Sequence, residues 1–231
     1  MPKLGTRKVY LLLIDTIREL SLRIGRDKLF KILRENDMLI RRRRKSIKTT
    51  NSNHQFRKYK NLIKDDETKK NNQVLVSDLT YIRVNEKFMY LTLVSDYRSR
   101  KIIGYNLSDD MTVRSSIESL KMAIGNLKRN SGVIHHSDRG IQYCSLDYTN
   151  LLNKYNIKIS MTEENHAYEN ATAERINGIL KGEFSLDSVF TSRRDATMAV
   201  DNAIHIYNNL RPHMSLNYKT PSEIYNNVNF F

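Results

Sequence analysis

The sequence predicts an α/β protein in which a basic helical region precedes a larger domain of strands and helices. Segments rich in β-branched and aromatic residues follow one another at 74–82, 87–97 and 100–107, and helical and strand-like segments alternate after them. Residues 1–70 carry 21 Lys and Arg against 8 Asp and Glu, whereas residues 71–231 carry 18 against 17. A basic block beside a nearly neutral domain indicates a polyanionic partner.

Two short helices are expected in the basic region. Apolar residues recur at helical spacing from Thr6 to Leu20 and again from Arg26 to Glu35. The short connection between these segments predicts a helix-turn-helix-like unit, so residues 1–45 are interpreted as a DNA-binding region.

Four consecutive arginines, Arg41, Arg42, Arg43 and Arg44, follow the second helix. Such a run is either a solvated surface segment or a contact for phosphate groups. We favour phosphate contact, because the neighbouring helices give the run an anchor. Residues 46–71 are polar and charged without a clear period, and they are interpreted as a linker.

The rest of the chain, 72–231, is predicted to form one domain. Its expected elements are an antiparallel meander of three strands at 74–82, 87–97 and 100–107, a helix at 112–127, a strand at 132–136, a helix at 145–155, a strand at 157–160, and helices at 168–184 and 196–207. Thr220, Pro221 and Glu223 have the spacing of a capping box and open a short last helix.

A single acidic residue interrupts the first strand of this domain. Alternation along the strand places Val74, Val76, Asp78, Thr80 and Ile82 on one face. A carboxylate in this largely apolar row is costly unless a cation or several donors meet it. An Asp that caps the strand end is the alternative interpretation for an isolated case.

Two further acids strengthen the functional interpretation. Asp138 follows a short buried strand and Glu174 lies on the helix at 168–184, with 59 residues between Asp78 and Asp138 and 35 between Asp138 and Glu174. Three carboxylates without a cation would repel one another, whereas Mg²⁺ or Mn²⁺ takes oxygen ligands. Two such ions about 4 Å apart support in-line displacement at phosphorus. Asp78, Asp138 and Glu174 are therefore candidate catalytic and metal-binding residues.

The helix at 168–184 places polar residues on one side. Asn170, Glu174, Asn177 and Lys181 share a face, because steps of three, four and seven residues return to the same side of a helix. Glu174 can then reach the metal ions, while Lys181 offers a cation to DNA and the amide of Asn170 can orient a phosphate or Glu174 itself.

Several other polar residues have structural alternatives. Asp96 is interpreted as a residue that initiates a turn rather than as a fourth ligand, and His135 and His136 as structural or substrate-orienting. Arg211 and His213 either contact DNA or fix their loop.

The composition limits the class of protein. The single cysteine, Cys144, excludes an internal disulfide and a cysteine-rich zinc site, and we expect it to be a small buried apolar residue. The apolar run from Val9 to Ile14 is too short to span a bilayer, and no secretory leader is visible. We expect a cytoplasmic, nucleoid-associated protein without a membrane partner.

With these residues in view, the chain resembles the DDE transposases of bacterial insertion sequences, of the orfB type, within the retroviral-integrase superfamily. The matching motifs are Asn72–Ile82, His136–Tyr143, Ser160–Thr162, Glu169–Glu174 with Leu180 and Lys181, and a closing pattern from Tyr207 to Pro221 that includes Arg211 and His213. The chain departs from the usual family residues at Leu75, at Glu169 and around 139–141, none of which is one of the three acids.

The resemblance implies a ribonuclease-H-like core with a mixed five-stranded sheet flanked by helices, preceded by the small basic helix-turn-helix-like domain. It also implies metal-dependent cleavage and strand transfer with two Mg²⁺ or Mn²⁺ ions, on element ends and a target duplex. A homo-multimer on DNA is implied too, and a separate helix-turn-helix partner protein is possible, since the N-terminal part is shorter than in full-length relatives. A ribonuclease-H-like nuclease and a non-catalytic DNA-binding relic are the alternatives.

Overall fold

A computed structural model describes residues 3–40, 55–63, 70–127, 132–163 and 170–227 of the chain. Its elements, in order, are α1 (Thr6–Glu19), α2 (Arg26–Glu35), β1 (Val74–Val84), β2 (Lys87–Asp96), β3 (Ile102–Ser108), α3 (Val113–Gly125), β4 (Ile134–Ser137), α4 (Ile141–Cys144), α5 (Leu146–Lys154), β5 (Lys158–Met161), α6 (Ala171–Glu183), β6 (Val189–Phe190), α7 (Arg193–Asn209), a 3-10 turn at Met214–Leu216 and α8 (Pro221–Asn226).

The central sheet has the predicted five strands in the order β3-β2-β1-β4-β5. Strands β1, β2 and β3 form the expected antiparallel meander, whereas β4 and β5 join parallel to β1. The two-residue strand β6 adds to the far end of β1, beside Arg83 and Val84. This mixed sheet agrees with the fold expected from the sequence.

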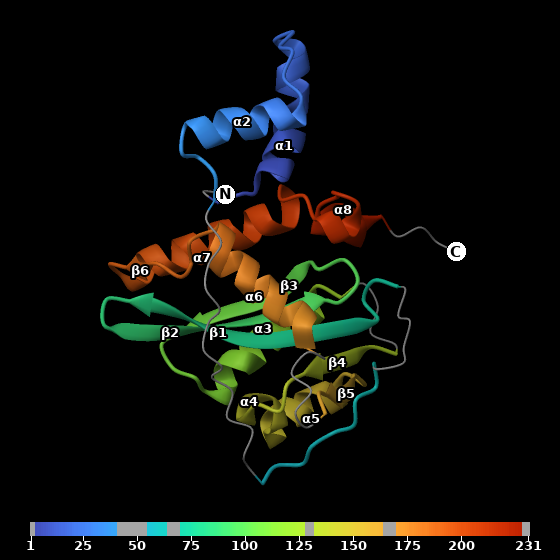
Figure 1. Ribbon diagram of the computed structural model, residues 1–231. Coiled ribbons are helices and arrows are strands. Elements are labelled where there is room, and N and C mark those ends of the chain that lie inside the picture. The colour runs from blue at the N-terminus through green and yellow to red at the C-terminus, as the bar shows by residue number, and fades with distance from the viewer. Residues whose placement is uncertain (1–2, 41–54, 64–69, 128–131, 164–169, 228–231) are drawn as a thin grey trace.

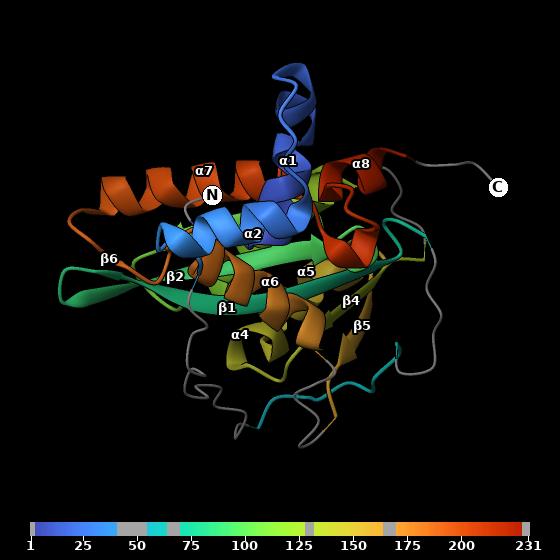
Figure 2. The same cartoon turned by 45° about the horizontal axis from the view of Figure 1, so that its top comes forward.

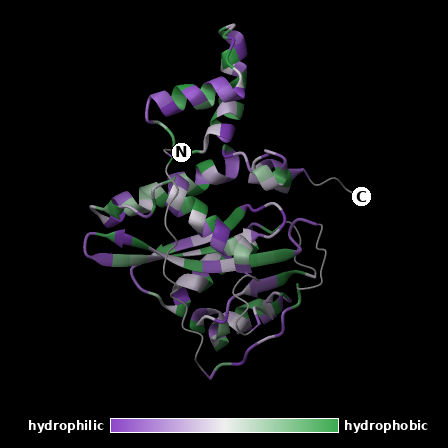
Figure 3. Ribbon diagram, viewed as in Figure 1, coloured by the Kyte–Doolittle hydropathy of each residue, from purple (hydrophilic) through white to green (hydrophobic). Residues whose placement is uncertain are grey.

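Helices cover both faces of the sheet (Figure 1). On one face, α3, α4 and α5 enclose a core that includes Leu75, Leu120 and Tyr148, all of them fully buried. On the other face, α6 and α7 pack on Ile82 and Leu91. Figure 3 shows hydrophobic residues interleaved with polar ones along the strands. Strand β2 is nevertheless buried at every position from Leu91 to Asp96, because both of its faces are covered.

The predicted alternation of β1 is confirmed. Val74 and Val76 pack with Ala173 of α6, and Ile82 belongs to the core beneath α6 and α7. Asp78 lies between them on the same side of the strand. The sheet thus presents this carboxylate to α6.

Helices α1 and α2 form where the sequence predicts them and stand on the α6 and α7 side of the core (Figure 2). They bury little, since α1 has no buried residue and α2 has only Leu29. The pair is anchored to the core at Glu183. The backbone N–H of Lys3 donates a hydrogen bond to the Glu183 carbonyl oxygen, and the Lys8 ammonium forms an ion pair of 2.9 Å with the Glu183 carboxylate.

Part of the predicted linker packs on the core. Leu62 N–H donates to Ser160 Oγ at 2.9 Å, and Met161 N–H donates to the Lys60 carbonyl at 3.4 Å. Tyr59 also packs against the core beneath α5. Residues 55–63 therefore follow strand β5, while 46–54 and 64–69 lie outside the described residues.

Several elements differ from the sequence prediction, and α6, for example, begins at Ala171 rather than at 168. Helix α7 begins at Arg193 rather than at 196, because Ser192 Oγ accepts a hydrogen bond from Asp195 N–H and caps the helix. The short elements α4 and β6 were not predicted.

No helix in the described part of the chain is long and apolar enough to span a bilayer.

Candidate active site

The register of two parallel strands brings Asp78 and Asp138 together. Val76 of β1 is paired with His136 of β4. Asp78 and Asp138 each lie two residues further along their chains, so the two carboxylates extend from neighbouring positions at the end of β4. Both residues are partly buried.

Asp78 is held by two donors. Its Oδ1 accepts a hydrogen bond of 2.9 Å from the N–H of Leu79, and its Oδ2 accepts one of 2.8 Å from the Asn177 amide. Burial, with smaller contributions from the charges of Asp138 and Glu174, nevertheless raises the pKa of Asp78 to about 7. The carboxylate therefore lies in a place where a cation would be stabilised.

Asp138 lies in the turn that joins β4 to α4. Its Oδ1 accepts a hydrogen bond of 3.0 Å from the N–H of Gly140. This bond fixes the side chain relative to the turn, which ends as α4 begins at Ile141.

Helix α6 contributes the third acid. Asn170 precedes the helix and donates from its amide to the Ser77 carbonyl at 3.1 Å, directly before Asp78 in the chain. One and two turns further, Glu174 is exposed on the same face and Asn177 bonds to Asp78. The two buried asparagines fasten α6 to β1, and Glu174 lies between them in the sequence of the helix.

The donor set fits Mg²⁺ or Mn²⁺ in its chemistry, because all three groups are carboxylates. Within the described ranges, however, no group of three or more His, Cys, Asp or Glu side chains has a geometry that could hold a metal ion. Asp78 and Asp138 are close neighbours across two strands, and Glu174 is near enough for its charge to raise the pKa of Asp78.

Lys181 lies beyond Asn177 on the same face of α6. Its ammonium group is 4.2 Å from the centre of the Tyr81 ring, which is a cation–π contact. Burial lowers the pKa of Lys181, while the charge of Asp78 acts in the opposite direction. The ammonium group is therefore near enough to Asp78 for the two charges to interact.

The two histidines before Asp138 are structural parts of the sheet. His135 Nε2 lies within hydrogen-bonding distance of the hydroxyls of Ser77 and Tyr148, at 2.7 and 2.9 Å. His136 Nδ1 is 2.8 Å from Ser160 Oγ. Both side chains are buried, and burial lowers the pKa of His135 to about 3, so it is neutral at pH 7.

Asp96 and Cys144 also have the predicted structural roles. The carboxylate of Asp96 is fully buried and accepts hydrogen bonds from the N–H of Asn72 at 2.7 Å and from the N–H and hydroxyl of Ser99 at 2.8 and 2.6 Å. Cys144 is buried, and burial raises the pKa of its thiol to about 11.

Arg211 has the structural role that the sequence left open. It is 3% exposed, and its guanidinium forms two hydrogen bonds of 2.7 Å to the carboxylate of Glu183. Because the Arg211 guanidinium is paired with the Glu183 carboxylate, we no longer assign Arg211 as a DNA contact. Arg41, Arg42, Arg43 and Arg44 lie outside the described residues.

Asn177 is the site residue that sequence reasoning did not assign. Its position three residues after Glu174 placed it on the correct face of the helix, but the partner of its amide lies 99 residues away. Only the packing of α6 on β1 joins the two.

Two family models, each described as an integrase core domain, match residues 68–167 and 155–221. The chain is 34% identical over 220 residues to the insertion element IS600 uncharacterized 31 kDa protein of Shigella sonnei, covering 94% of this chain and 79% of the relative. It is 37% identical over 156 residues to the transposase InsF for insertion sequence IS3A of Escherichia coli (strain K12), covering 67% of this chain but only 54% of that relative, about half of its length.

Two solved structures share the fold at lower identity. The HTLV-2 integrase catalytic core domain in complex with magnesium superimposes with a TM-score of 0.53 at 21% identity, over 67% of this chain and 97% of that one. A chain of the simian T-cell lymphotropic virus intasome, in complex with PP2A regulatory subunit B56 gamma, superimposes with a TM-score of 0.58 at 17% identity. The match covers 98% of this chain and 76% of that one.

Proposed function

Because this chain belongs to the family of integrase-core DDE transposases of insertion elements, we propose that it cleaves DNA strands and joins them to a target duplex. The observation that carries the proposal is the parallel register of β1 and β4, because Asp78 on β1 and Asp138 just after β4 follow the paired residues Val76 and His136 by the same two positions. The raised pKa of Asp78, caused by burial and then by the charge of Asp138, supports a cation-dependent role for this pair.

In this proposal Asp78, Asp138 and Glu174 hold Mg²⁺ or Mn²⁺, with two ions expected. Two such ions would polarise the attacking and leaving oxygens of an in-line displacement at phosphorus. The HTLV-2 integrase catalytic core domain, which shares the fold, was solved in complex with magnesium, and this is consistent with the assignment.

The protein groups have separate tasks. Asn177 positions Asp78 through its hydrogen bond to Oδ2, and Asn170 holds α6 against β1 through the Ser77 carbonyl. Lys181 is placed to contact a DNA phosphate next to the acids. The arginines 41–44 and the helices α1 and α2 would bind DNA through its backbone, and residues 1–45, 46–71 and 72–231 remain the proposed division of the chain.

The partners proposed are the element ends, a target duplex and further copies of this chain, assembled as a homo-multimer on DNA. A separate helix-turn-helix partner protein is a further proposal.

A strand-transfer assay tests the reaction. A labelled duplex that carries the element's own ends is incubated with Mg²⁺ and either the wild type, Glu174→Ala or Glu118→Ala. Glu118 is a matched control, because it is an exposed acid on α3 that pairs with Lys121. We expect joined products from the wild type and Glu118→Ala, and a loss of at least about a hundredfold in Glu174→Ala, because a transition-state charge loses its support.

The other outcomes separate the alternative functions. Cleavage without joining would identify a nuclease. DNA binding without either reaction, in all three proteins, would identify a binding protein and overturn the proposal.

A further inference from the structure

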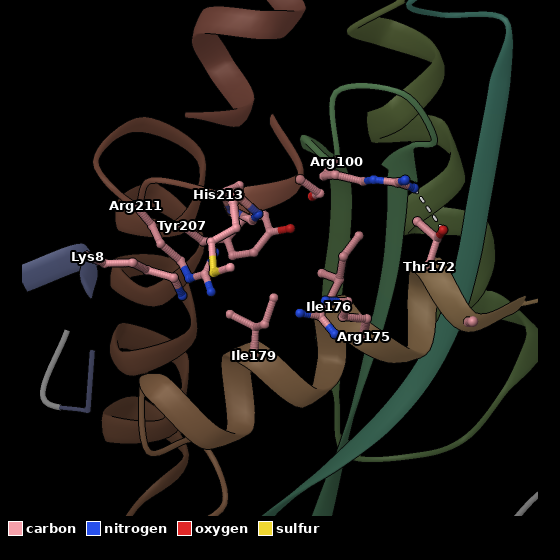
Figure 4. Close-up of a pocket in the computed structure, with 12 residues that line it drawn as sticks. Lys8, Arg100, Thr172, Arg175, Ile176, Ile179, Tyr207, Arg211 and His213 are labelled. Atoms are coloured by element: carbon pink, nitrogen blue, oxygen red, sulfur yellow. Dashed lines mark hydrogen bonds between the residues drawn. The ribbon is translucent and has the colours of Figure 1, made fainter. Parts of the chain in front are cut away.

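A cavity of about 290 Å³ is lined by residues of helix α6 together with residues of α1 and α7 (Figure 4). Thr172, Arg175, Ile176 and Ile179 line it from the side of α6 opposite to Glu174. A volume near the lower limit for ligand pockets suits a small chemical group.

Four cationic side chains from four parts of the fold surround this cavity: Lys8 of α1, Arg100 after β2, Arg175 of α6 and Arg211 after α7. Glu183 pairs with Lys8 and Arg211. Arg100 and Arg175 form no ion pair in the part of the chain that the structure describes, although the charge of Arg100 acts on the buried Asp96. The cavity therefore has an excess of positive charge.

The side chains of Arg100 and Arg175 differ in how firmly they are held. Arg100 is oriented by a hydrogen bond of 2.7 Å to Thr172 Oγ1 and by the Tyr97 ring, whose centre is 4.8 Å from its guanidinium carbon. Arg175 is exposed at the rim. A preoriented guanidinium beside a free one is suited to an oxyanion, because the planar fork donates two parallel hydrogen bonds.

Two buried polar atoms line the same cavity without a hydrogen-bond partner among the described residues. They are the hydroxyl of Tyr207, in a side chain with no exposed surface, and Nε2 of His213, which is 5% exposed. In Figure 4 the Tyr207 hydroxyl points away from α7, toward the space above α6. A buried polar group left unpaired costs free energy, so these atoms indicate a missing partner.

We propose that this cavity binds a phosphate group, with Arg100, Arg175, Tyr207 and His213 donating to its oxygens. A phosphate oxygen accepts hydrogen bonds, whereas a cation would be repelled by the surrounding guanidinium groups. Burial, followed by the charges of Arg211 and Lys8, lowers the pKa of His213 to about 3, so the ring is neutral and can still donate from Nε2. The proposal does not depend on the reaction at Asp78, since the two sites lie on opposite faces of α6.

Inorganic phosphate is the first probe. The unfolding temperature of the full chain is measured against phosphate concentration at pH 7.5, with NaCl added to keep the ionic strength constant. Wild type is compared with Arg175→Gln, Tyr207→Phe and the control Arg194→Gln, which removes one exposed arginine of α7 outside the cavity.

Phosphate is expected to stabilise wild type and Arg194→Gln equally, with an affinity about tenfold lower in Tyr207→Phe and in Arg175→Gln, as for a lost hydrogen bond to a charged group. In NaCl alone, Tyr207→Phe should unfold no earlier than wild type, because its hydroxyl has no partner to lose. No stabilisation beyond the NaCl control, or the same stabilisation in all four proteins, would overturn the proposal.

A labelled DNA duplex without Mg²⁺ distinguishes the source of the phosphate. If its affinity falls in Tyr207→Phe and Arg175→Gln but not in Arg194→Gln, the cavity takes a backbone phosphate of DNA. If duplex binding is equal in all four proteins while phosphate binding is lost in the two variants, the cavity takes a free anion. Glu174→Ala should retain phosphate binding, which separates this result from a failure of the proposed reaction.

Discussion

At the scale of single residues, Asp78 is held in an environment that penalises its charge. The folded protein raises its pKa to about 7 through burial and the nearby Asp138, whereas an unfolded Asp titrates near 3.9. Below about pH 3 both states are protonated, so the ionisation of Asp78 has no effect on stability. Between pH 4 and 7 the unfolded state releases its proton first, and the free energy of unfolding falls as pH rises.

Asp78→Asn should therefore stabilise the metal-free protein by up to about 4 kcal/mol at pH 8 and have little effect below about pH 3. The amide can retain the bond to Asn177, whose Oδ1 has no hydrogen-bond partner among the described residues and can accept after a flip. Urea unfolding in EDTA at several pH values measures the difference. A variant less stable than wild type at pH 8 would contradict this account.

Asn177 is expected to act through Asp78. Its hydrogen bond lowers the pKa of that carboxyl, so Asn177→Ala should raise it. At pH 7 the variant should need several-fold more Mg²⁺ for half-maximal strand transfer, and at pH 8.5 the difference should shrink, because the carboxyl is ionised in both proteins. Asn153→Ala, at an exposed position of α5, is the control, and a deficit that does not depend on pH would argue for a purely structural role.

At the scale of elements, the sheet and α3 meet at Gly104 of β3. A Cβ atom there would lie 2.1 Å from the Ser119 carbonyl oxygen and 2.7 Å from the Ala123 nitrogen, both of them backbone atoms of α3. Helix α3 can approach β3 this closely only because residue 104 has no side chain.

Gly104→Ala should lower the free energy of unfolding by about 3 kcal/mol, since the helix must move to relieve the overlap. Gly125→Ala, at the end of α3, is the matched control, because no atom lies within 4 Å of its added Cβ and it should be neutral or slightly stabilising. Urea unfolding of both variants checks the prediction, and equal effects would show that the contact is not tight.

At the scale of the whole molecule, Glu183 joins three parts of the chain. It pairs with Lys8 of α1 at 2.9 Å and with Arg211 after α7 at 2.7 Å, and Arg211 is nearly buried. The N-terminal helices bury few apolar side chains, so this ionic junction contributes much of their attachment to the core.

Glu183→Gln should destabilise the protein by about 2 kcal/mol, because a buried guanidinium loses its counter-charge. Lys8→Gln should cost less than about 1 kcal/mol, since the pair of Arg211 and Glu183 remains. Urea unfolding measures both, and hydrogen exchange in α1 should increase in each variant. Equal stability of the two variants would mean that Arg211 does not need the carboxylate.

The parts of this molecule that local patterns determine were predicted well. The β-branched alternation of β1 placed Asp78 on the side that faces α6, and helical spacing placed Asn177 and Lys181 on the side of α6 that faces β1. The capping box of α8 is present as predicted. The contacts that decide the roles of Arg211 and Asn177 span 28 and 99 residues. A periodic sequence pattern cannot predict such contacts, because they depend on how distant elements pack together. Strand β6 was missed since two residues are too few for alternation to be visible.

The segment 55–63 has a practical consequence for work on fragments that contain the central sheet. Strand β5 ends the main strand order of the sheet, and Lys60 and Leu62 supply hydrogen-bonding partners along it. A protein truncated to begin at Asn72 would leave this strand uncovered, and an uncovered edge is a template for pairing between molecules. Fragments of the core that retain residues from 55 onward should therefore aggregate less during expression and storage than fragments that begin after the linker.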